Sequence, residues 1–385
     1  MDAKPKRRRI RTSSMKLLLA CVSLTFSLLV VEIAVRLTWS TPWRIPREAF
    51  AESDVFRFRL KPEFSCDVPI VDADSFRIVT NERGFRGPTV ASIQECDLRI
   101  VSIGDSFTFG WGLPRTEHCM ERWLDDFRVA HPDRQIGHAF VALPKWSPKD
   151  YYFAYLEEVR PLQADIVVLG VFPGNDLLER SAGKFRTTRE AAEHGRSQPR
   201  PGKSVLTLSR WYTFDWMKAQ IRATPVLANL AVTLGARPVE FERFARDETK
   251  QQELWDTSLF YLTELERAVS EDGGRLVMIS YPSKTQFDSA DYLNNEYYDP
   301  KMPDAVLSGF CERADTPFIA LLSDLQESGK CVYWDIDRHM NSTGQAVAAA
   351  TISKTLTPVV EQRLLAVPRR LSRDGERNRP IAVRR

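Results

Sequence analysis

The chain has 385 residues, enough to bury a substantial core in one large domain or two smaller ones. Hydrophobic residues make up 43% of it and charged residues 27%, a composition that excludes a disordered chain. The formal net charge is only +3 and the basic excess lies at the two ends, so the charge does not favour nucleic-acid binding by the central part. We therefore expect a folded body with no nucleic-acid partner.

The N-terminal residues form a basic segment followed by an apolar run. Residues 1–16 are rich in Lys and Arg, and the run from Leu17 to Val35 contains Glu32 as its ionisable residue. At about 1.5 Å per residue, this run is close to the roughly 20 residues that cross a bilayer as a helix. Because basic residues stay on the cytoplasmic side, we expect a cytoplasmic tail over residues 1–16, a transmembrane anchor over residues 17–37, and an extracytoplasmic body in the periplasm or at the cell surface.

A cleaved signal peptide is the alternative interpretation of the apolar run. Small residues typical of a cleavage site do not follow the run, whereas Trp39 and Trp43 suit a membrane interface. We therefore favour a retained single-pass anchor.

The cysteines and histidines limit the chemistry that the chain can carry. Of six cysteines, Cys21 lies in the apolar run. In an oxidising compartment Cys311 can pair with Cys331, or Cys66 with Cys96, and buried free thiols are the alternative. Only five histidines are present, without a Cys or His spacing typical of zinc, so we expect neither a metal nor a cofactor.

The rest of the chain predicts an α/β domain. Residues 43–97, with several prolines and a turn-like stretch from Asn81 to Pro88, are expected to form an irregular lead-in. Residues 98–362 alternate short apolar runs with helical patterns, which is typical of a doubly wound, mainly parallel sheet with flanking helices. The expected strands are Leu98–Ile103, Ala164–Phe172, Arg275–Ser280 and Thr316–Leu321, and the expected helices run from Ser106 to Phe127, from about Glu248 to Glu271 and from Thr343 to Gln362.

Two segments depart from this alternation. Residues 180–245 form an insertion that begins without apolar periodicity and then becomes aromatic from Leu206 to Leu234. This aromatic part is either a lid over the site or an extra helical pair packed on the sheet. Residues 363–385 are basic and nearly devoid of apolar side chains, and we expect a disordered tail.

Ser106 is the first candidate catalytic residue. A serine hydroxyl needs an exposed position on a sharp turn and a base that removes its proton. Ser106 lies where the first strand turns into a helix, at the carboxyl edge of the expected sheet. Gly-Asp-Ser is also an ordinary turn and helix cap, so this serine alone does not indicate catalysis.

Further polar residues occur where a serine nucleophile would need them. His339 precedes the last helix and can serve as the base, while Asp337 two residues earlier can orient its ring, with Asp335 as the alternative. Asn175 directly follows the second strong strand, on the same edge as Ser106, and its amide can stabilise an oxyanion. Each of these residues also suits an ordinary turn.

Taken together, the motifs resemble those of the SGNH (GDSL-like) hydrolases. Ile103-Gly104-Asp105-Ser106-Phe107, Gly174-Asn175-Asp176 and Asp337-Arg338-His339 stand in the family's order, and the N-terminal anchor with the Asn81–Gly87 stretch resembles membrane-anchored bacterial members. The resemblance implies a flavodoxin-like sheet, with Ser106 as nucleophile, His339 as base and Asp337 as the orienting carboxylate. It also implies an oxyanion hole made by the Ser106 N–H, the Asn175 amide and a backbone N–H from the family's second block.

Two positions differ from the family pattern. The second block carries a glycine in the family, and Lys145 stands at the matching position here. The backbone N–H is retained, but the Lys side chain can crowd the oxyanion hole or add positive charge to it. The last block reads Asp-x-His instead of Asp-x-x-His, with Ile336 at the more usual Asp position.

These residues predict a membrane-anchored extracytoplasmic serine esterase that forms an acyl-enzyme on Ser106. The anchor favours an acylated glycan or lipid of the cell envelope as substrate. One alternative is an O-acetyltransferase that uses the same triad to modify a polysaccharide. Another is an inactive envelope scaffold or carbohydrate-binding protein on the same fold.

Overall fold

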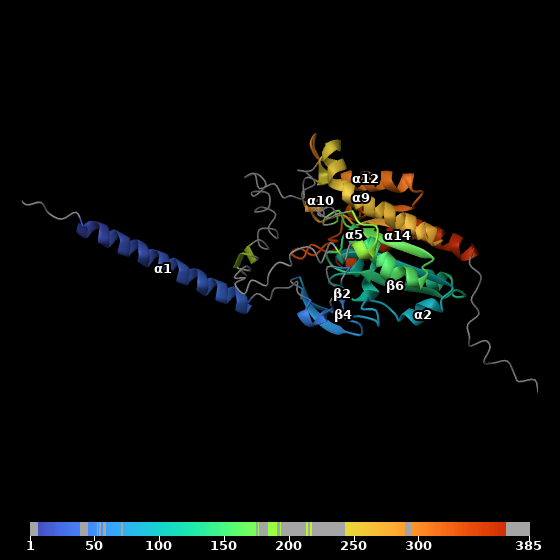
Figure 1. The fold of residues 1–385 in the computed structure, drawn as a ribbon, viewed down its shortest axis with the longest axis horizontal. Helices are drawn as coiled ribbons and strands as arrows, with labels where there is room; N and C mark the ends of the chain where they lie inside the picture. The colour runs from blue at the N-terminus through green and yellow to red at the C-terminus, as the bar shows by residue number, and fades with distance from the viewer. Residues whose placement is uncertain are drawn as a thin grey trace, which may run out of the picture.

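Figure 1 shows an α/β body and a long N-terminal helix, α1 (Arg7–Thr38), that extends away from it. This computed structural model describes residues 7–38, 45–51, 53, 55–56, 59–70, 72–174, 176, 184–190, 193, 213–214, 216–217, 243–288 and 294–366. Most of the insertion predicted at 180–245, including its expected lid or helical pair, lies outside these residues, as does the tail from 367 onward.

The central sheet has five parallel strands in the order β6-β5-β7-β8-β9. The chain begins at β5, adds β6 on one side and then β7, β8 and β9 on the other, which is the order of flavodoxin-like folds. The expected doubly wound parallel sheet is therefore confirmed. The strands are β5 (Leu98–Gly104), β6 (Ile136–Ala142), β7 (Ile166–Val171), β8 (Arg275–Ser280) and β9 (Phe318–Ala320).

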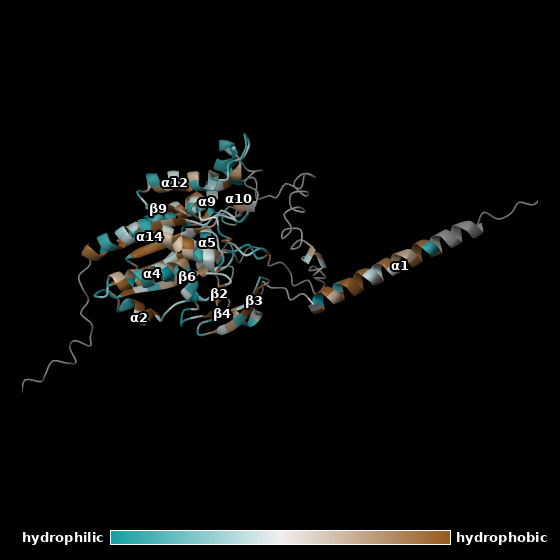
Figure 2. Cartoon of the chain, turned by 180° about the vertical axis from the view of Figure 1, so that it is seen from behind, coloured by the Kyte–Doolittle hydropathy of each residue, from teal (hydrophilic) through white to brown (hydrophobic). Residues whose placement is uncertain are grey.

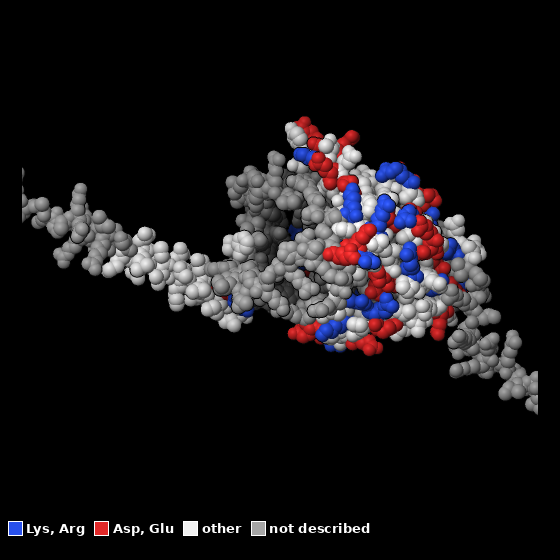
Figure 3. Space-filling view, viewed as in Figure 1, with Lys and Arg blue, Asp and Glu red and all other residues white. Residues whose placement is uncertain are grey.

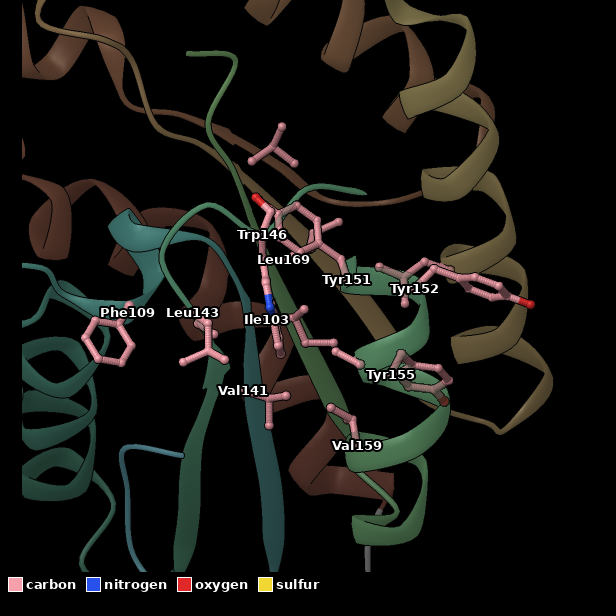
Figure 4. Close-up of a cluster of buried hydrophobic side chains, with 14 of the residues drawn as sticks. Ile103, Phe109, Val141, Leu143, Trp146, Tyr151, Tyr152, Tyr155, Val159 and Leu169 are labelled. Atoms are coloured by element: carbon pink, nitrogen blue, oxygen red, sulfur yellow. The ribbon is translucent and has the colours of Figure 1, made fainter. Parts of the chain in front are cut away.

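Helices cover both faces of this sheet, which explains its continuously apolar strands. On one face Ile100 and Val168 pack with α4 and α14, and on the other Ile103 and Leu169 pack with α5 and α9. Figure 4 shows the second cluster, with Tyr151 of α5 directed at the strands and Tyr152 directed away from them. The helices that follow β5 are α3 (Ser106–Phe109), α4 (Cys119–Ala130), α5 (Pro148–Ala154), α9 (Glu248–Glu271), α10 (Thr285–Asp288), α12 (Met302–Arg313), α13 (Leu322–Glu327) and α14 (Ser342–Ala366). Two short 3₁₀ helices, η2 (Arg115–Glu117) and η4 (Arg160–Leu162), and one π-helical turn, η3 (Tyr155–Val159), lie between them.

The predicted helix from Ser106 to Phe127 is wrong as a single element. α3 ends at Phe109, and the φ of 72° at the following Gly110 is the left-handed conformation typical of a helix C-terminus. Gly112 also has a positive φ, of 86°, so the chain turns away before α4 begins. The break creates a loop beside Ser106 that carries Trp111.

Strand β6 was missed in the sequence because its apolar run is interrupted by Gly137 and His138. The packing explains both residues. At Gly137 there is little room for a side chain beside Cys96, and the ring of His138 is hydrogen-bonded to Ser102 and Glu121.

The lead-in is more regular than predicted. It contains two antiparallel pairs, β1 (Phe50–Ala51) with β2 (Arg59–Leu60) and β3 (Ser65–Ile70) with β4 (Ala73–Val79). Pro69 obscured the second pair, although the pairing tolerates it next to a register shift. Apolar residues of β3 and β4 join the main core, so this hairpin packs on the body. The short elements around it are η1 (Arg47–Ala49) and α2 (Val90–Gln94).

The two ends of the chain can be compared with the predicted anchor and the predicted disordered tail. The predicted anchor is a helix, and its segment Met15–Thr38, with mean hydropathy 2.4, is long and apolar enough to cross a membrane. Figure 2 shows most of this helix in brown as it extends from the body, and its apolar side chains are exposed. At the other end α14 continues to Ala366, so residues 363–366 are helical, not disordered.

Charges and thiols complete the description of the body. Acidic and basic side chains are interspersed on the face shown in Figure 3. All six cysteines are free, so neither of the two pairings forms, and Cys119 and Cys311 are buried thiols.

Candidate active site

Ser106 begins α3 directly after the end of β5, at the carboxyl edge of the sheet. Asp105 caps this short helix, because its Oδ1 accepts the Phe107 N–H at 2.8 Å. Gly104 is required at the turn, since a side chain there would collide with Thr108 and with the Gly170 carbonyl. The order of strands reverses between β5 and β7, which is where ligands bind in open α/β sheets.

A chain of hydrogen bonds links Ser106 to the C-terminal motif. His339 Nε2 lies 2.8 Å from Ser106 Oγ, and His339 Nδ1 lies 2.6 Å from Asp337 Oδ1. In this geometry Ser106 O–H donates to Nε2, and the Nδ1–H donates to the carboxylate. Asp335 lies apart from this chain, because its carboxylate accepts from Lys284 Nζ at 2.9 Å. The structure therefore brings Asp337, not Asp335, to His339.

The charges of the pair stabilise each other. Burial alone raises the pKa of Asp337, but the His339 charge, the His339 hydrogen bonds and the Trp111 N–H lower it more, so the net pKa lies below its ordinary value. Burial lowers the pKa of His339, and the Asp337 charge and hydrogen bond raise it more, so the net pKa lies above its ordinary value. This arrangement favours an imidazolium ring facing a carboxylate, the state formed when the serine proton is taken up.

Residues outside the sequence motifs hold Asp337 and its loop. Trp111 Nε1 donates to Asp337 Oδ2 at 3.1 Å. Asp72, at the turn between β3 and β4, accepts the backbone N–H groups of Ile336 and Asp337 at 2.9 and 2.7 Å through Oδ2. Arg338 adopts a φ of 69°, so the short Asp-x-His motif has an unusual backbone that these contacts stabilise. The lead-in hairpin therefore contributes directly to the site.

A second support lies under the loop that carries Trp111. The buried Arg86 guanidinium donates to the carbonyls of Phe109, Gly110 and Leu113, at 2.6, 3.1 and 2.9 Å. Burial lowers the pKa of Arg86 to about 10, so it remains charged at neutral pH. His118 Nε2 donates to the Phe107 carbonyl at 3.1 Å, and burial lowers its pKa to about 3, so the ring is neutral. Sequence patterns gave no signal for these supports.

Two of the predicted oxyanion donors, the backbone N–H groups of Ser106 and Lys145, belong to neighbouring segments at the carboxyl edge of the sheet. Leu143 N–H donates to the Gly104 carbonyl at 3.3 Å, which puts the loop after β6 beside the Ser106 turn. Within that loop Lys145 has a φ of 69°, the left-handed region that glycine favours, in agreement with its match to the family's glycine. Asn175 lies outside the described residues.

The residue after Asn175 is firmly held. The buried Asp176 accepts from Tyr151 Oη through Oδ1 and from the Phe172 N–H through Oδ2, both at 2.8 Å, and its carbonyl accepts from Ser258 Oγ at 2.7 Å. The end of β7 is thereby tied to α5 and α9. Within the described part of the chain, no group of three or more His, Cys, Asp or Glu side chains is arranged to hold a metal.

A second serine–histidine–carboxylate arrangement was not predicted. Ser102 Oγ lies 2.8 Å from His138 Nε2, and His138 Nδ1 lies 2.7 Å from Glu121 Oε1, which also accepts from Arg115 at 3.0 Å. Ser102, His138 and Glu121 are 0%, 2% and 4% exposed, so this cluster is closed to solvent.

We compared the chain with protein families, curated proteins and solved structures, and only solved structures are similar to it. No protein-family model matches the sequence, and no curated protein matches it. Similar solved structures include TesA (11% identity, 68% of this chain and 99% of that chain, TM-score 0.40) and an acetylxylan esterase from Geobacillus stearothermophilus (11%, 67% and 93%, 0.39). A GDSL-like lipase from Parabacteroides merdae is also similar (11%, 67% and 95%, 0.40). Similarity at this level does not assign an activity, so the proposed function rests on the site.

Proposed function

We propose that this protein is a membrane-anchored serine esterase of the SGNH type, with Ser106 as nucleophile, His339 as base and Asp337 as the orienting carboxylate. The observation that carries this proposal is the continuous Ser106–His339–Asp337 hydrogen-bond chain at the carboxyl edge of the sheet. Ser106 is 6% exposed, and the His339 side chain bonded to it is 23% exposed, so the hydrogen-bond chain borders the surface at His339. The inactive-scaffold alternative has no comparable support, because all three side chains stand in working geometry.

In the proposed reaction, Ser106 Oγ attacks the ester carbonyl carbon while His339 Nε2 takes the hydroxyl proton. The resulting oxyanion is stabilised by the backbone N–H of Ser106, by the Lys145 N–H and by the Asn175 amide. His339 then gives the proton to the departing alkoxide oxygen, which leaves an acyl-enzyme on Ser106. Water, activated by the same histidine, attacks the acyl carbon and releases the acid.

The location and substrate follow from α1. An apolar helix preceded by Lys and Arg favours an anchor whose N-terminus is cytoplasmic and whose catalytic body is extracytoplasmic. We propose an acylated glycan or lipid of the cell envelope as the substrate, because the body is then held beside such molecules.

The direct test is labelling of the detergent-solubilised full chain with a fluorophosphonate, which reacts with an activated serine. We expect labelling of wild type, none of Ser106→Ala, and normal labelling of Ser102→Ala, the matched control. Equal labelling of wild type and Ser106→Ala would contradict the assignment, and absence of labelling in both would favour the inactive scaffold. Adding a polysaccharide acceptor to an acyl-ester assay then tells whether water or a sugar hydroxyl accepts the acyl group.

A further inference from the structure

A short segment of the insertion is hydrogen-bonded to the C-terminal part of α1, the end nearer the body. Thr213 donates to Glu32 Oε2 through its backbone N–H at 3.0 Å and through Oγ1 at 2.8 Å, and Arg36 Nε donates to Glu32 Oε1 at 2.7 Å. Glu32 is only 7% exposed. A carboxylate in an apolar helix is costly unless it is paired, and these donors supply the pairing. The contact accounts for a glutamate in an otherwise apolar run.

The depth of this contact follows from the helix geometry. Glu32 lies six residues before the end of α1 at Thr38, or about 9 Å along the axis at the α-helical rise. The candidate span Met15–Thr38 ends at the same residue. The span is about 36 Å long and the hydrocarbon core about 30 Å thick, so the contact with Thr213 lies within about 6 Å of the level where the span leaves the core for the headgroups.

The side chains that follow Thr213 suit that level. Phe214, Trp216 and Met217 are 56%, 38% and 47% exposed. Aromatic side chains with a polar edge concentrate at membrane interfaces, and exposed apolar groups gain free energy by entering the boundary between headgroups and acyl chains. Three exposed apolar side chains therefore follow the residue that is bonded to α1.

We propose that Thr213, Phe214, Trp216 and Met217 form a membrane-contact segment that enters the interface of the bilayer crossed by α1. The proposal rests on the proposed membrane anchor. Its consequence concerns the active site, because β7 ends at Val171 on the carboxyl edge of the sheet and the insertion that carries Thr213 follows it in the chain. In addition, α14 starts next to His339 and its C-terminal end lies on the side of the body away from α1 (Figure 1). The Ser106 edge therefore faces the bilayer, and the enzyme takes esters that are presented at the membrane surface.

The test is photo-crosslinking in vesicles of phosphatidylethanolamine and phosphatidylglycerol that contain a traceable phospholipid. A benzophenone side chain is placed in the full chain at position 216, at position 217 or, as control, at position 365. Leu365 is 87% exposed but lies at the far end of α14. We expect severalfold more lipid adduct at 216 and 217 than at 365, and a loss of this excess when Thr213→Val removes the hydroxyl donor to Glu32.

The outcomes separate this proposal from the anchor itself. If carbonate extraction leaves the protein in the vesicles while 216 and 217 react no more than 365, the membrane-contact segment is wrong and the anchor stands. If carbonate releases the protein, the anchor is wrong. A second readout concerns the substrate: Thr213→Val should lower hydrolysis of a vesicle-borne ester severalfold and leave hydrolysis of a small soluble ester unchanged, and an equal loss on both would overturn the membrane-facing site.

Discussion

Two serine–histidine–carboxylate arrangements lie at one strand of this protein. Ser102 is inside β5 and Ser106 follows its end. In both, a histidine Nε2 lies 2.8 Å from the serine Oγ, and the Nδ1 lies 2.6 or 2.7 Å from a carboxylate oxygen. The His339 side chain is 23% exposed, whereas the His138 side chain is 1% exposed. By hydrogen-bond geometry alone the two cannot be told apart.

Their surroundings differ in the features that acyl transfer requires. Ser102 is paired with Phe140 and Val168 in the neighbouring strands, so its backbone belongs to the sheet and no ester can reach it. Ser106 begins a helix, where backbone N–H groups have no intrahelical acceptor and can face an oxyanion. The comparison teaches that access and oxyanion donors, more than the triad distances, distinguish a catalytic serine from a structural one.

The largest expected effect is a loss of activity that separates Ser106 from Ser102. Ser106→Ala should lower kcat for ester hydrolysis by on the order of 10⁵-fold, because the nucleophile is removed and only binding and oxyanion stabilisation remain. Ser102→Ala should leave kcat within about twofold and lower the free energy of unfolding by about 1–3 kcal/mol, because it leaves the buried His138 Nε2 without its partner. Steady-state kinetics and urea unfolding measure the two effects. A large activity loss in Ser102→Ala with wild-type stability would contradict the distinction.

Substitution of the two carboxylates should likewise have different effects, on activity for Asp337 and on stability for Glu121. Asp337→Asn should lower kcat by about 10⁴-fold, since the amide no longer stabilises the imidazolium or keeps the ring in the required tautomer. Glu121→Gln should retain activity within severalfold and lower the free energy of unfolding by about 1–3 kcal/mol. A strong activity loss in Glu121→Gln, measured on a protein shown to be folded, would contradict the structural role of the buried cluster.

The same pair predicts a pH dependence. His339 must be neutral to accept the serine proton, and Asp337 holds its pKa above the ordinary value. The acid limb of kcat/KM should therefore lie above the ordinary histidine range. Burial alone lowers the pKa, so in Asp337→Asn the limb should move to lower pH for the residual activity. A pH–rate profile of both proteins measures the shift, and an unmoved limb would indicate that another group controls it.

A smaller effect is expected from the lead-in hairpin. Asp72→Ala removes the acceptor for two backbone N–H groups of the Asp337 loop and should lower kcat about tenfold with little change in KM, because a misplaced triad slows the chemical step. Asp72→Asn keeps an acceptor oxygen and should restore part of the activity. Asp67→Ala is the matched control, since Asp67 lies on the same hairpin in an exposed pair with Arg77. Equal losses in Asp72→Ala and Asp67→Ala would argue against a positioning role.

What the sequence predicted and what it missed have a physical explanation. Strands β7 and β8 are buried on both faces and read as unbroken apolar runs, so their place and parallel pairing could be predicted. Ser106 and His339 stand in local motifs with a known order. Asp72 and Arg86 act through contacts that join residues far apart in the chain, and neither has a local pattern that indicates its partner. The Ser102 cluster was missed because His138 lies in the strand that was not recognised.

The smallest expected effect concerns Lys145, whose backbone N–H we propose as an oxyanion donor for Ser106. Its φ of 69° is strained for a side-chain-bearing residue, and the proposed role needs only its backbone N–H. Lys145→Gly should therefore leave kcat/KM within about twofold and raise the free energy of unfolding by no more than about 1 kcal/mol, since relief of strain is partly offset by the freedom that glycine adds to the unfolded chain. Glu63→Gly, at a φ of 50° in the lead-in, is the control for the backbone effect. If Lys145→Gly and Lys145→Ala both lose activity while Glu63→Gly does not, the lysine side chain itself takes part, and the oxyanion site carries a charge that the family's glycine does not supply.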